Sequence, residues 1–300
     1  MIRNLLLPGA GLRGVSYTGA VKALYELDII DYIENICGVS AGSIVALLLC
    51  LELTYKELYA LTMKVCSIEH LRTFDNEDIF KVYERYGVES GANIEKIIEL
   101  ILYSKTGRKA CTFKLLHTAF PNKTLIIAGT NVSTNSTEYF NYTNTPDMEI
   151  TTAIRISLSV PLIFTKVEYK NNIYTDGGVS CNIPIEYFTE DIDRTLVILL
   201  SDIPDYSEID HFEKYLWRVF NLLISQGDKY IIHKYRKNII EVVVHFNSFD
   251  IAGLDSNKKN ELIDEAYSQF TRKFKESVFH PAYETIIIKD VMEQLITDVQ

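Results

Sequence analysis

The stretch "NICGVSAGSIVALLL", residues 35–49, constrains the fold of this chain more than any other. Its centre, Gly38-Val39-Ser40-Ala41-Gly42, has the form G-x-S-x-G. A short apolar run that suits a buried strand precedes this centre, and a longer apolar run of helical length follows it. A strand that turns sharply into a helix lifts the serine oxygen toward backbone N–H groups, which favour negative charge. The pattern predicts Ser40 as a nucleophile; the simpler alternative is that these residues only cap a core helix.

The flanking glycines Gly38 and Gly42 support the first interpretation, because a tight turn leaves little room for Cβ atoms. A nucleophilic serine also needs a group that accepts its proton and donors that hold a developing oxyanion. Both have to come from elsewhere in the chain.

A glycine-rich loop near the amino terminus is the candidate for the donors. Gly9, Ala10, Gly11 and Gly14 lie between an expected strand at 2–7 and an expected helix at 15–27, and such a loop exposes consecutive backbone N–H groups. A dinucleotide or phosphate site is the alternative, but the P-loop Lys-Ser/Thr pair is absent and no acidic residue ends the second strand. Arg13 either supports the loop and nearby negative charge or is a solvated loop arginine.

Histidine is the usual proton acceptor for a serine. In a hydrolase of the α/β type the histidine comes late in the chain, so His233, His245 and His280 are formal candidates. None of the three follows glycines or a turn that would present its ring to Ser40. A structural role is the favoured interpretation for each.

A carboxylate is the other candidate. In "YTDGGVSCNIP", Asp176 comes at the end of an expected strand, and Gly177 and Gly178 let the backbone fold tightly after it. A partly buried carboxylate can accept the proton of a serine directly when the geometry is good. The simpler alternative is a common Asp-Gly turn.

The rest of the chain alternates strands and helices, which favours an α/β fold around a largely parallel sheet. We expect further strands at 32–39, 124–133, 137–143, 194–201 and 238–246, with a hairpin over 164–178 that turns at Asn171-Asn172. We expect helices at 40–53, from a capping box at Thr54–Glu57, at 93–102, from 145 to 159 and at 211–236, with two more after 246.

Composition narrows the function classes. The net charge of −10 argues against binding to nucleic acid, which requires clustered Lys and Arg. The five cysteines are scattered without metal-ligand spacing, which predicts free thiols in a reducing compartment. The amino terminus has too few consecutive apolar residues for a signal peptide, and the apolar run 44–53 is too short to span a membrane. We therefore expect a cytoplasmic protein.

Taken together and in this order, the three segments resemble the patatin-like phospholipase family. Residues 9–14 are similar to its oxyanion loop G-G-G-x-R/K-G, Gly38–Gly42 to its nucleophile elbow, and Asp176–Gly178 to its D-G-G/A box. Weaker similarity extends over 124–140 and 153–167. The resemblance implies a three-layer α/β fold with a mostly parallel central sheet flanked by helices. Residues 1–200 would form the catalytic core, and residues 201–300 an extension packed on the same domain.

The resemblance also implies a chemistry: a Ser40–Asp176 dyad, an oxyanion hole around Gly9, Ala10, Gly11, Arg13 and Gly14, and no metal or cofactor. The expected substrate is a membrane phospholipid or another acyl lipid, reached by peripheral contact with a membrane. A soluble carboxylesterase or thioesterase, a non-enzymatic scaffold of the same fold, and an α/β-hydrolase with a late histidine are the alternatives. Lipid preference and oligomeric state stay open.

Two features are left over. Ala10 stands where the family usually has its middle glycine, and a positive φ would be costly for alanine, so the loop is expected to differ slightly in shape. On the helix at 211–236, Tyr215, Trp217, Phe220 and Leu223 form either an interfacial patch or lid, or a stripe that packs on the core.

Overall fold

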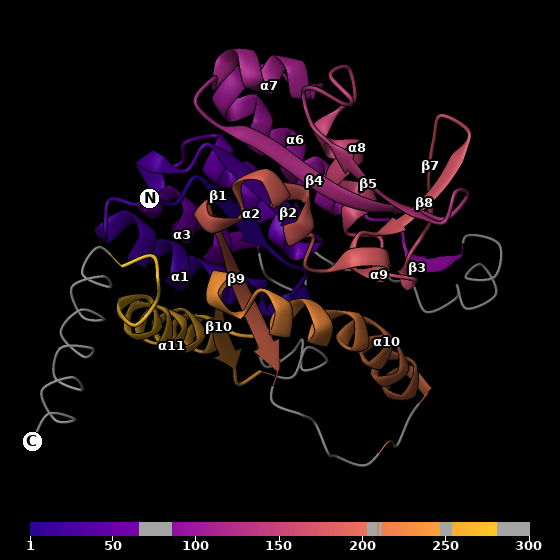
Figure 1. Ribbon diagram of the computed structural model, residues 1–300. Helices are drawn as coiled ribbons and strands as arrows, with labels where there is room; N and C mark the ends of the chain where they lie inside the picture. Colours follow the sequence, from indigo (N-terminus) through magenta and orange to yellow (C-terminus); the bar gives the residue numbers. More distant parts are fainter. Residues whose placement is uncertain (66–85, 203–208, 210–211, 247–253, 281–300) are drawn as a thin grey trace, which may run out of the picture.

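The computed structural model describes residues 1–65, 86–202, 209, 212–246 and 254–280 (Figure 1). Its strands are β1 (Asn4–Leu7), β2 (Asn35–Val39), β3 (Gly87–Glu89), β4 (Thr124–Asn131), β5 (Ser136–Phe140), β6 (Leu162–Phe164), β7 (Val167–Tyr169), β8 (Asn172–Asp176), β9 (Thr195–Asp202) and β10 (Ile239–Val244). Its α-helices are α1 (Tyr17–Glu26), α2 (Ala41–Cys50), α3 (Tyr55–Val65), α6 (Ala92–Thr106), α7 (Phe113–Ala119), α8 (Ile150–Ser157), α9 (Gly178–Cys181), α10 (Phe212–Lys234) and α11 (Ser256–Lys275). Short 3-10 helices are η1 (Gly11–Ser16), η2 (Ile30–Tyr32), η3 (Ile185–Arg194) and η4 (Arg236–Asn238).

The central sheet is mostly parallel, as expected. Its strands follow the order β10-β9-β1-β2-β4-β8-β7, and β5 pairs with β4. Strands β10, β9, β1, β2 and β4 run parallel, whereas β5 and β8 are antiparallel to β4. The carboxyl ends of β1 and β2 therefore lie at one end of the sheet, where the glycine loop and the Ser40 turn begin.

Alternating side chains on these strands build two apolar layers, one on each face. One face carries Leu5, Leu7, Ile36, Leu125, Ile127, Leu196 and Ile198, in the larger core with α1, α2, α8 and α11. The other face carries Leu6, Cys37, Ile126, Val197 and Leu199, covered by η3 and by the end of α10. Because successive strand residues point to opposite faces, both faces of a strand such as Leu5-Leu6-Leu7 must be apolar in such a sheet. The result is the three-layer α/β architecture predicted from the sequence.

The carboxyl-terminal third adds to the same sheet. Strand β10 pairs with β9 from Ile239 to Val244, and α11 packs on both β10 and α1 (Figure 1). The helices approach closely at Gly19 of α1, where a Cβ atom would lie 1.9 Å from the carbonyl oxygen of Ile263. The division into a core at 1–200 and an extension at 201–300 stays a prediction.

Part of the expected carboxyl-terminal detail lies outside the described residues. The predicted stripe falls on α10, where the side chain of Tyr215 is exposed; the side chains of Trp217, Phe220 and Leu223 are not described. The second of the two helices expected after residue 246 also lies outside the described residues. No helix in the described part of the chain is both long enough and apolar enough to cross a membrane.

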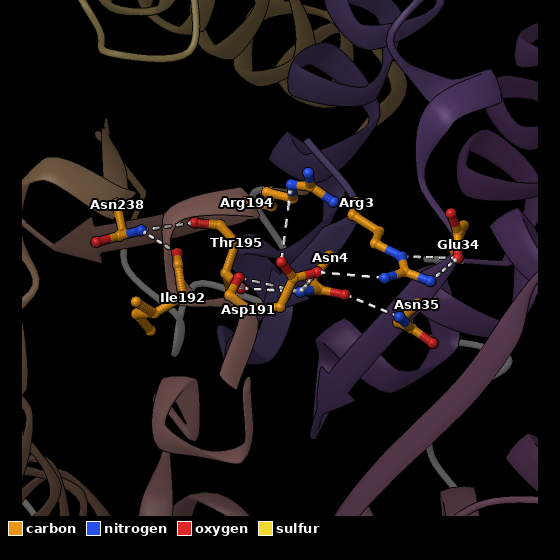
Figure 2. A network of polar contacts seen from close by, with 9 residues as sticks. All are labelled: Arg3, Asn4, Glu34, Asn35, Asp191, Ile192, Arg194, Thr195 and Asn238. Carbon is orange, nitrogen blue, oxygen red and sulfur yellow. Dashed lines mark hydrogen bonds and ion pairs between the residues drawn. The ribbon is translucent and has the colours of Figure 1, made fainter. Parts of the chain in front are cut away.

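A buried polar network holds the amino-terminal ends of the strands (Figure 2). Asn4 opens β1, and its Nδ2 donates to Thr195 Oγ1 at 3.0 Å at the start of β9. Its Oδ1 accepts from Asn35 Nδ2 at 2.8 Å at the start of β2. Asn238, before β10, donates to the carbonyl of Thr195 at 3.0 Å. Since a one-residue slip would break these bonds, the network helps to fix the strand register at the end away from the Ser40 turn.

Several local predictions are confirmed or corrected. Thr54 and Glu57 bond reciprocally at the start of α3, as a capping box should. The β7–β8 hairpin turns at Lys170-Asn171, one residue before the expected pair, and both residues have positive φ, which suits a two-residue hairpin turn. Helix α8 begins at Ile150 rather than at 145. The small β3–β6 sheet was not predicted.

Candidate active site

The turn between β2 and α2 holds Ser40 in a strained conformation. Its φ and ψ are 49° and −126°, which a non-glycine residue adopts only when its surroundings require it. The Ser40 N–H donates to Ser157 Oγ at 2.8 Å, and Ser157 in turn donates to the carbonyl of Ala128 at 2.7 Å. The Ser40 carbonyl accepts from Ser43 Oγ at 2.6 Å. The backbone of Ser40 is thus bonded on both sides.

Both glycines of the motif are sterically required. A Cβ atom on Gly38 would lie 2.4 Å from Ser43 Cα, and one on Gly42 would lie 2.0 Å from the carbonyl oxygen of Leu7. Helix α2 is therefore pressed against the end of β1, which brings the glycine loop after β1 to the start of α2. The alternative in which these residues only cap a helix does not account for the strained backbone at Ser40.

Asp176 ends β8, in the antiparallel pair with β4. Its N–H donates to the carbonyl of Ser159 at 3.0 Å, and its Oδ1 accepts from the Gly178 N–H at 2.8 Å. A Cβ atom on Gly177 would lie 2.4 Å from the carbonyl oxygen of Ala128, so the chain after Asp176 folds back closely on β4. Gly178 lets its N–H approach the carboxylate, since a Cβ there would be 3.1 Å from Oδ1.

The Asp176 carboxyl group is buried beside the Ser40 hydroxyl. Asp176 is 3% exposed and Ser40 is 6% exposed. Burial raises the pKa of Asp176 to about 7, against smaller lowering effects of the Ser40 hydroxyl and the Gly178 N–H. Oδ2 accepts no hydrogen bond from a described residue. The Ser40 hydroxyl nevertheless lies near enough to the carboxyl to lower its pKa. A carboxylate with a free buried oxygen and a raised pKa has the properties of a general base.

The glycine loop passes directly over Ser40. A Cβ atom on Gly9 would lie 3.1 Å from Ser40 Cβ and 2.8 Å from Asn182 Oδ1. The peptide before Gly9 is bonded on both sides: the Pro8 carbonyl accepts from the Tyr17 hydroxyl at 2.7 Å, and the Gly9 N–H donates to Asn182 Oδ1 at 2.8 Å. The Gly9 N–H is therefore already occupied in this structure.

The next two N–H groups of the loop differ from that of Gly9. The Ala10 carbonyl accepts from the Arg13 N–H and from Arg13 Nε, each at 3.2 Å. In a trans peptide the C=O and N–H point in opposite directions, so the Gly11 N–H points away from Arg13. Within the described residues, the N–H groups of Ala10 and Gly11 donate to no acceptor. They are the two candidates for binding an oxyanion.

The structure answers two questions that the sequence left open, the backbone conformation of Ala10 and the environment of Arg13. Ala10 has φ −142°, so alanine fits without strain, and the positive φ of the loop falls on Gly11 at 54°. Arg13 is buried, which excludes the interpretation as a solvated loop arginine, and burial lowers its pKa to about 10. Gly14 lies against the start of α2, where a Cβ would be 3.1 Å from Ala41 Cβ.

The histidines with described positions lie in other contacts. His233 is exposed in the last turn of α10, His245 Nδ1 lies 4.0 Å from Glu265 Oε1, and His280 packs against the Phe274 ring. His117 stacks on Tyr142. None of these contacts involves the Ser40 or Asp176 side chains; His70 and His211 lie outside the described residues.

Two residues beside the dyad candidates were not singled out from the sequence. Ser157 accepts the Ser40 N–H, and Asn182 accepts the Gly9 N–H. Asn182 falls six positions after Asp176 in a stretch already notable for its glycines, but a single asparagine or serine carries no local signal of its partner. Across the described residues, no three His, Cys, Asp or Glu side chains gather as a metal site.

Comparison with known proteins adds to this geometry. A model of the patatin-like phospholipase family matches residues 5–189, which include the glycine loop, the Ser40 turn and Asp176. The uncharacterized protein R571 of Acanthamoeba polyphaga mimivirus is 34% identical over 206 residues, covering 67% of this chain and 66% of that one. The probable lipid hydrolase 463L of invertebrate iridescent virus 6 is 33% identical over 186 residues, covering 61% and 62%. The matches span slightly less than two thirds of both relatives.

Solved structures share the fold at low identity. VipD from Legionella pneumophila superposes with a TM-score of 0.64 at 16% identity, over 92% of this chain and 67% of that chain. ExoU in its complex with SpcU, from the type III secretion system of Pseudomonas aeruginosa, gives 0.53 at 18% identity, over 92% and 52%. At this identity the likeness concerns the fold alone.

Proposed function

Because the chain belongs to the patatin-like phospholipase family, we propose that it is a lipid acyl hydrolase of phospholipase A type, with Ser40 and Asp176 as a catalytic dyad. One observation carries the dyad: the buried Asp176 carboxyl, with one oxygen unbonded, lies beside the hydroxyl of a serine whose backbone is held in a strained turn. The relative named as a probable lipid hydrolase supports the substrate class.

In the first half of the proposed reaction, Ser40 Oγ attacks the carbonyl carbon of an acyl ester and its proton passes to Asp176. The carbonyl oxygen becomes an oxyanion, to which the N–H groups of Ala10 and Gly11 donate. Collapse of this intermediate breaks the ester C–O bond, and the leaving alcohol takes the proton from Asp176. An acyl group then remains on Ser40.

In the second half, a water molecule attacks the acyl carbon and gives its proton to Asp176. The oxyanion forms in the same place, the bond to Ser40 Oγ breaks, and Asp176 returns the proton to Ser40 while the fatty acid leaves. Arg13 would favour the negative charge through the loop that it holds. Apart from the ester and water, each step uses only groups of this chain, so the proposal needs no metal or cofactor.

Exposed apolar side chains near the dyad support a lipid substrate and peripheral contact with a membrane. Leu162 and Ile163 are 50% and 40% exposed, three and four residues after Ser159, whose carbonyl holds the Asp176 N–H. Val179, beside Gly178, is 41% exposed. Such side chains are suited to acyl chains at a membrane surface. Free thiols at Cys37, Cys50 and Cys111 fit the proposed cytoplasmic location.

A fluorophosphonate probe and phospholipid vesicles test the proposal. The wild type should react with the probe and release fatty acid, Ser40→Ala should do neither, and Asp176→Asn should lose turnover while keeping its fold by circular dichroism. Hydrolysis of short soluble esters without hydrolysis of vesicles would favour the esterase alternative. A protein that reacts with neither would refute the enzymatic proposal in favour of the scaffold.

The histidines provide the matched control. His233→Ala, His245→Ala and His280→Ala should each keep full turnover, because none belongs to the proposed dyad. Loss of turnover in one of them, with Asp176→Asn still active, would overturn the assignment of the base.

A further inference from the structure

The Asn182 side chain lies between the glycine loop and α10, and its orientation is determined by its partners. The Gly9 N–H can only donate, so the atom that faces it at 2.8 Å must be Oδ1. Nδ2 therefore faces the other way, and it donates to Asp228 Oδ2 at 2.9 Å. A carboxylate only accepts when ionised, so the three groups form a chain of fixed direction: Gly9 N–H to Asn182, and Asn182 to Asp228.

Asn182 also lies close to both halves of the proposed dyad. Its Oδ1 would be 2.8 Å from a Cβ on Gly9 and 3.3 Å from a Cβ on Gly178. A Cβ on Gly9 would also lie 3.1 Å from Ser40 Cβ, and the N–H of Gly178 donates to Asp176 Oδ1. A shift of the Asn182 amide would therefore displace the glycine loop next to Ser40.

Asp228 brings the carboxyl-terminal third of the chain into this arrangement. It lies on α10, which packs on α9 just ahead of Asn182. Its carboxyl group is partly buried, and the burial raises its pKa to about 6 against the opposing effect of Asn182. Burial removes water from the Asp228 carboxylate at a cost in free energy, and the hydrogen bond from Asn182 Nδ2 offsets part of that cost. Without Asp228, Asn182 Nδ2 would in turn lose its acceptor.

We propose that Asn182 and Asp228 are positioning residues for the oxyanion hole. By occupying the Gly9 N–H and fixing the Pro8–Gly9 peptide together with Tyr17, they leave the N–H groups of Ala10 and Gly11 as the donors that face the reacting carbonyl. The inference rests on the proposed hydrolase function. It gives α10 a part in catalysis without contact with the substrate.

Exchanging the two side-chain types tests the inference. Asn182→Asp places two carboxylates where a donor now meets an acceptor. Asp228→Asn supplies the complementary change, because its amide can turn Nδ2 toward a carboxylate at residue 182. The double variant Asn182→Asp/Asp228→Asn restores a donor and an acceptor in reversed positions and keeps the net charge of the wild type. Asp193→Asn, at an exposed pair with Lys237, is the control for loss of a carboxylate elsewhere.

The measurements are kcat and KM for a soluble acyl ester at pH 8, and the hydrogen-exchange rate of the Gly9 amide. We expect Asn182→Asp to lower kcat by about 10- to 100-fold with little change in KM, since a misplaced donor acts on the transition state. Asp193→Asn should stay near the wild type. The double variant should recover most of kcat, and Gly9 exchange should be fast only in Asn182→Asp.

The outcomes separate this inference from the proposed function. If the wild type hydrolyses the ester and Asn182→Asp has unchanged kcat, or the double variant stays as impaired as Asn182→Asp, the positioning inference is wrong and the hydrolase proposal stands. If the wild type hydrolyses neither the soluble ester nor phospholipid vesicles, the hydrolase proposal fails. Gly9 exchange then decides whether Asn182 anchors the loop: unchanged exchange in Asn182→Asp refutes the anchor, and exchange that is fast there but slow in the double variant supports it.

Discussion

Asp176→Asn is expected to stabilise the fold while it abolishes turnover. The wild-type carboxyl is buried, with a pKa of about 7 in place of the ordinary 3.8. Below pH 3.8 the folded and unfolded chains both hold the proton, so the group has no effect on stability. Between pH 3.8 and 7 the unfolded chain releases the proton while the folded chain keeps it. The free energy of unfolding therefore falls as the pH rises through this window and levels off above 7.

The size of the effect follows from the two pKa values. One pKa unit corresponds to about 1.4 kcal/mol, so ionised Asp176 lowers the free energy of unfolding by about 4 kcal/mol at pH 8. Asparagine does not ionise, and its Oδ1 can still accept the Gly178 N–H. Its amide Nδ2 would lie where Oδ2 has no partner, which costs about 1–3 kcal/mol at every pH. The net gain at pH 8 is thus about 1–3 kcal/mol.

The pH dependence is more diagnostic than the net gain, because the cost of the asparagine amide does not vary with pH. Urea unfolding of both proteins between pH 4 and 8 should show the difference in free energy moving by about 4 kcal/mol in favour of Asp176→Asn. Asp193→Asn, at an exposed carboxylate, should show no such movement. A difference between the wild type and Asp176→Asn that stays constant over this range would refute the buried, proton-holding carboxyl.

Three further substitutions, one of them with a control, test the parts around the proposed dyad. Ser157→Ala leaves the Ser40 N–H without its acceptor, and should lower unfolding free energy by about 1–3 kcal/mol and kcat by about 10-fold or more, as denaturation and ester hydrolysis would show. Gly42→Ala places a Cβ 2.0 Å from a backbone oxygen and should lower the free energy of unfolding by about 3 kcal/mol or more. Its control is Gly227→Ala, which has open space around it and should stabilise α10 by up to about 1 kcal/mol. Melting temperatures compare the two variants. Ala10→Gly should leave kcat unchanged and lower stability by about 0.5–1 kcal/mol, because alanine already fits its negative φ; a gain in kcat would show that the loop is strained.

Local sequence was sufficient where the partners are close along the chain. The strand, the Ser40 turn and α2 lie within sixteen residues, so the glycines and the apolar pattern were enough to place them. The capping box of α3 is a second example, since its two bonds join residues three apart. In both cases the interaction that decides the structure is itself local.

The site was less predictable where it depends on distant partners. Asp176 could be suggested as the base, but its burial comes from the antiparallel pairing of β8 with β4 and from Gly177 against Ala128. The acceptors of the Ser40 and Gly9 N–H groups, Ser157 and Asn182, are brought in by the tertiary fold. Neither periodicity nor composition indicates which donor a single polar side chain will meet.

The φ value of Ala10 is a second feature of the site that local sequence did not predict. A family pattern with glycine at this position suggested a positive φ, whereas Ala10 has φ −142° while its carbonyl accepts from Arg13. The positive φ moves to Gly11, where no Cβ opposes it. A loop of this shape is therefore compatible with alanine.

The close contact of α1 with α11 bears on when the core of this protein can close during its synthesis. The apolar side of α1 is completed by Leu262, Ile263, Ala266 and Phe270 of α11. A ribosome adding roughly 5–20 residues per second releases the Ser40 turn on the order of tens of seconds before α11. Until then β9 lacks β10 and α1 lacks its cover, so the nascent chain cannot close its core. Ser40 and Asp176 would therefore leave the ribosome well before the helix that completes this core.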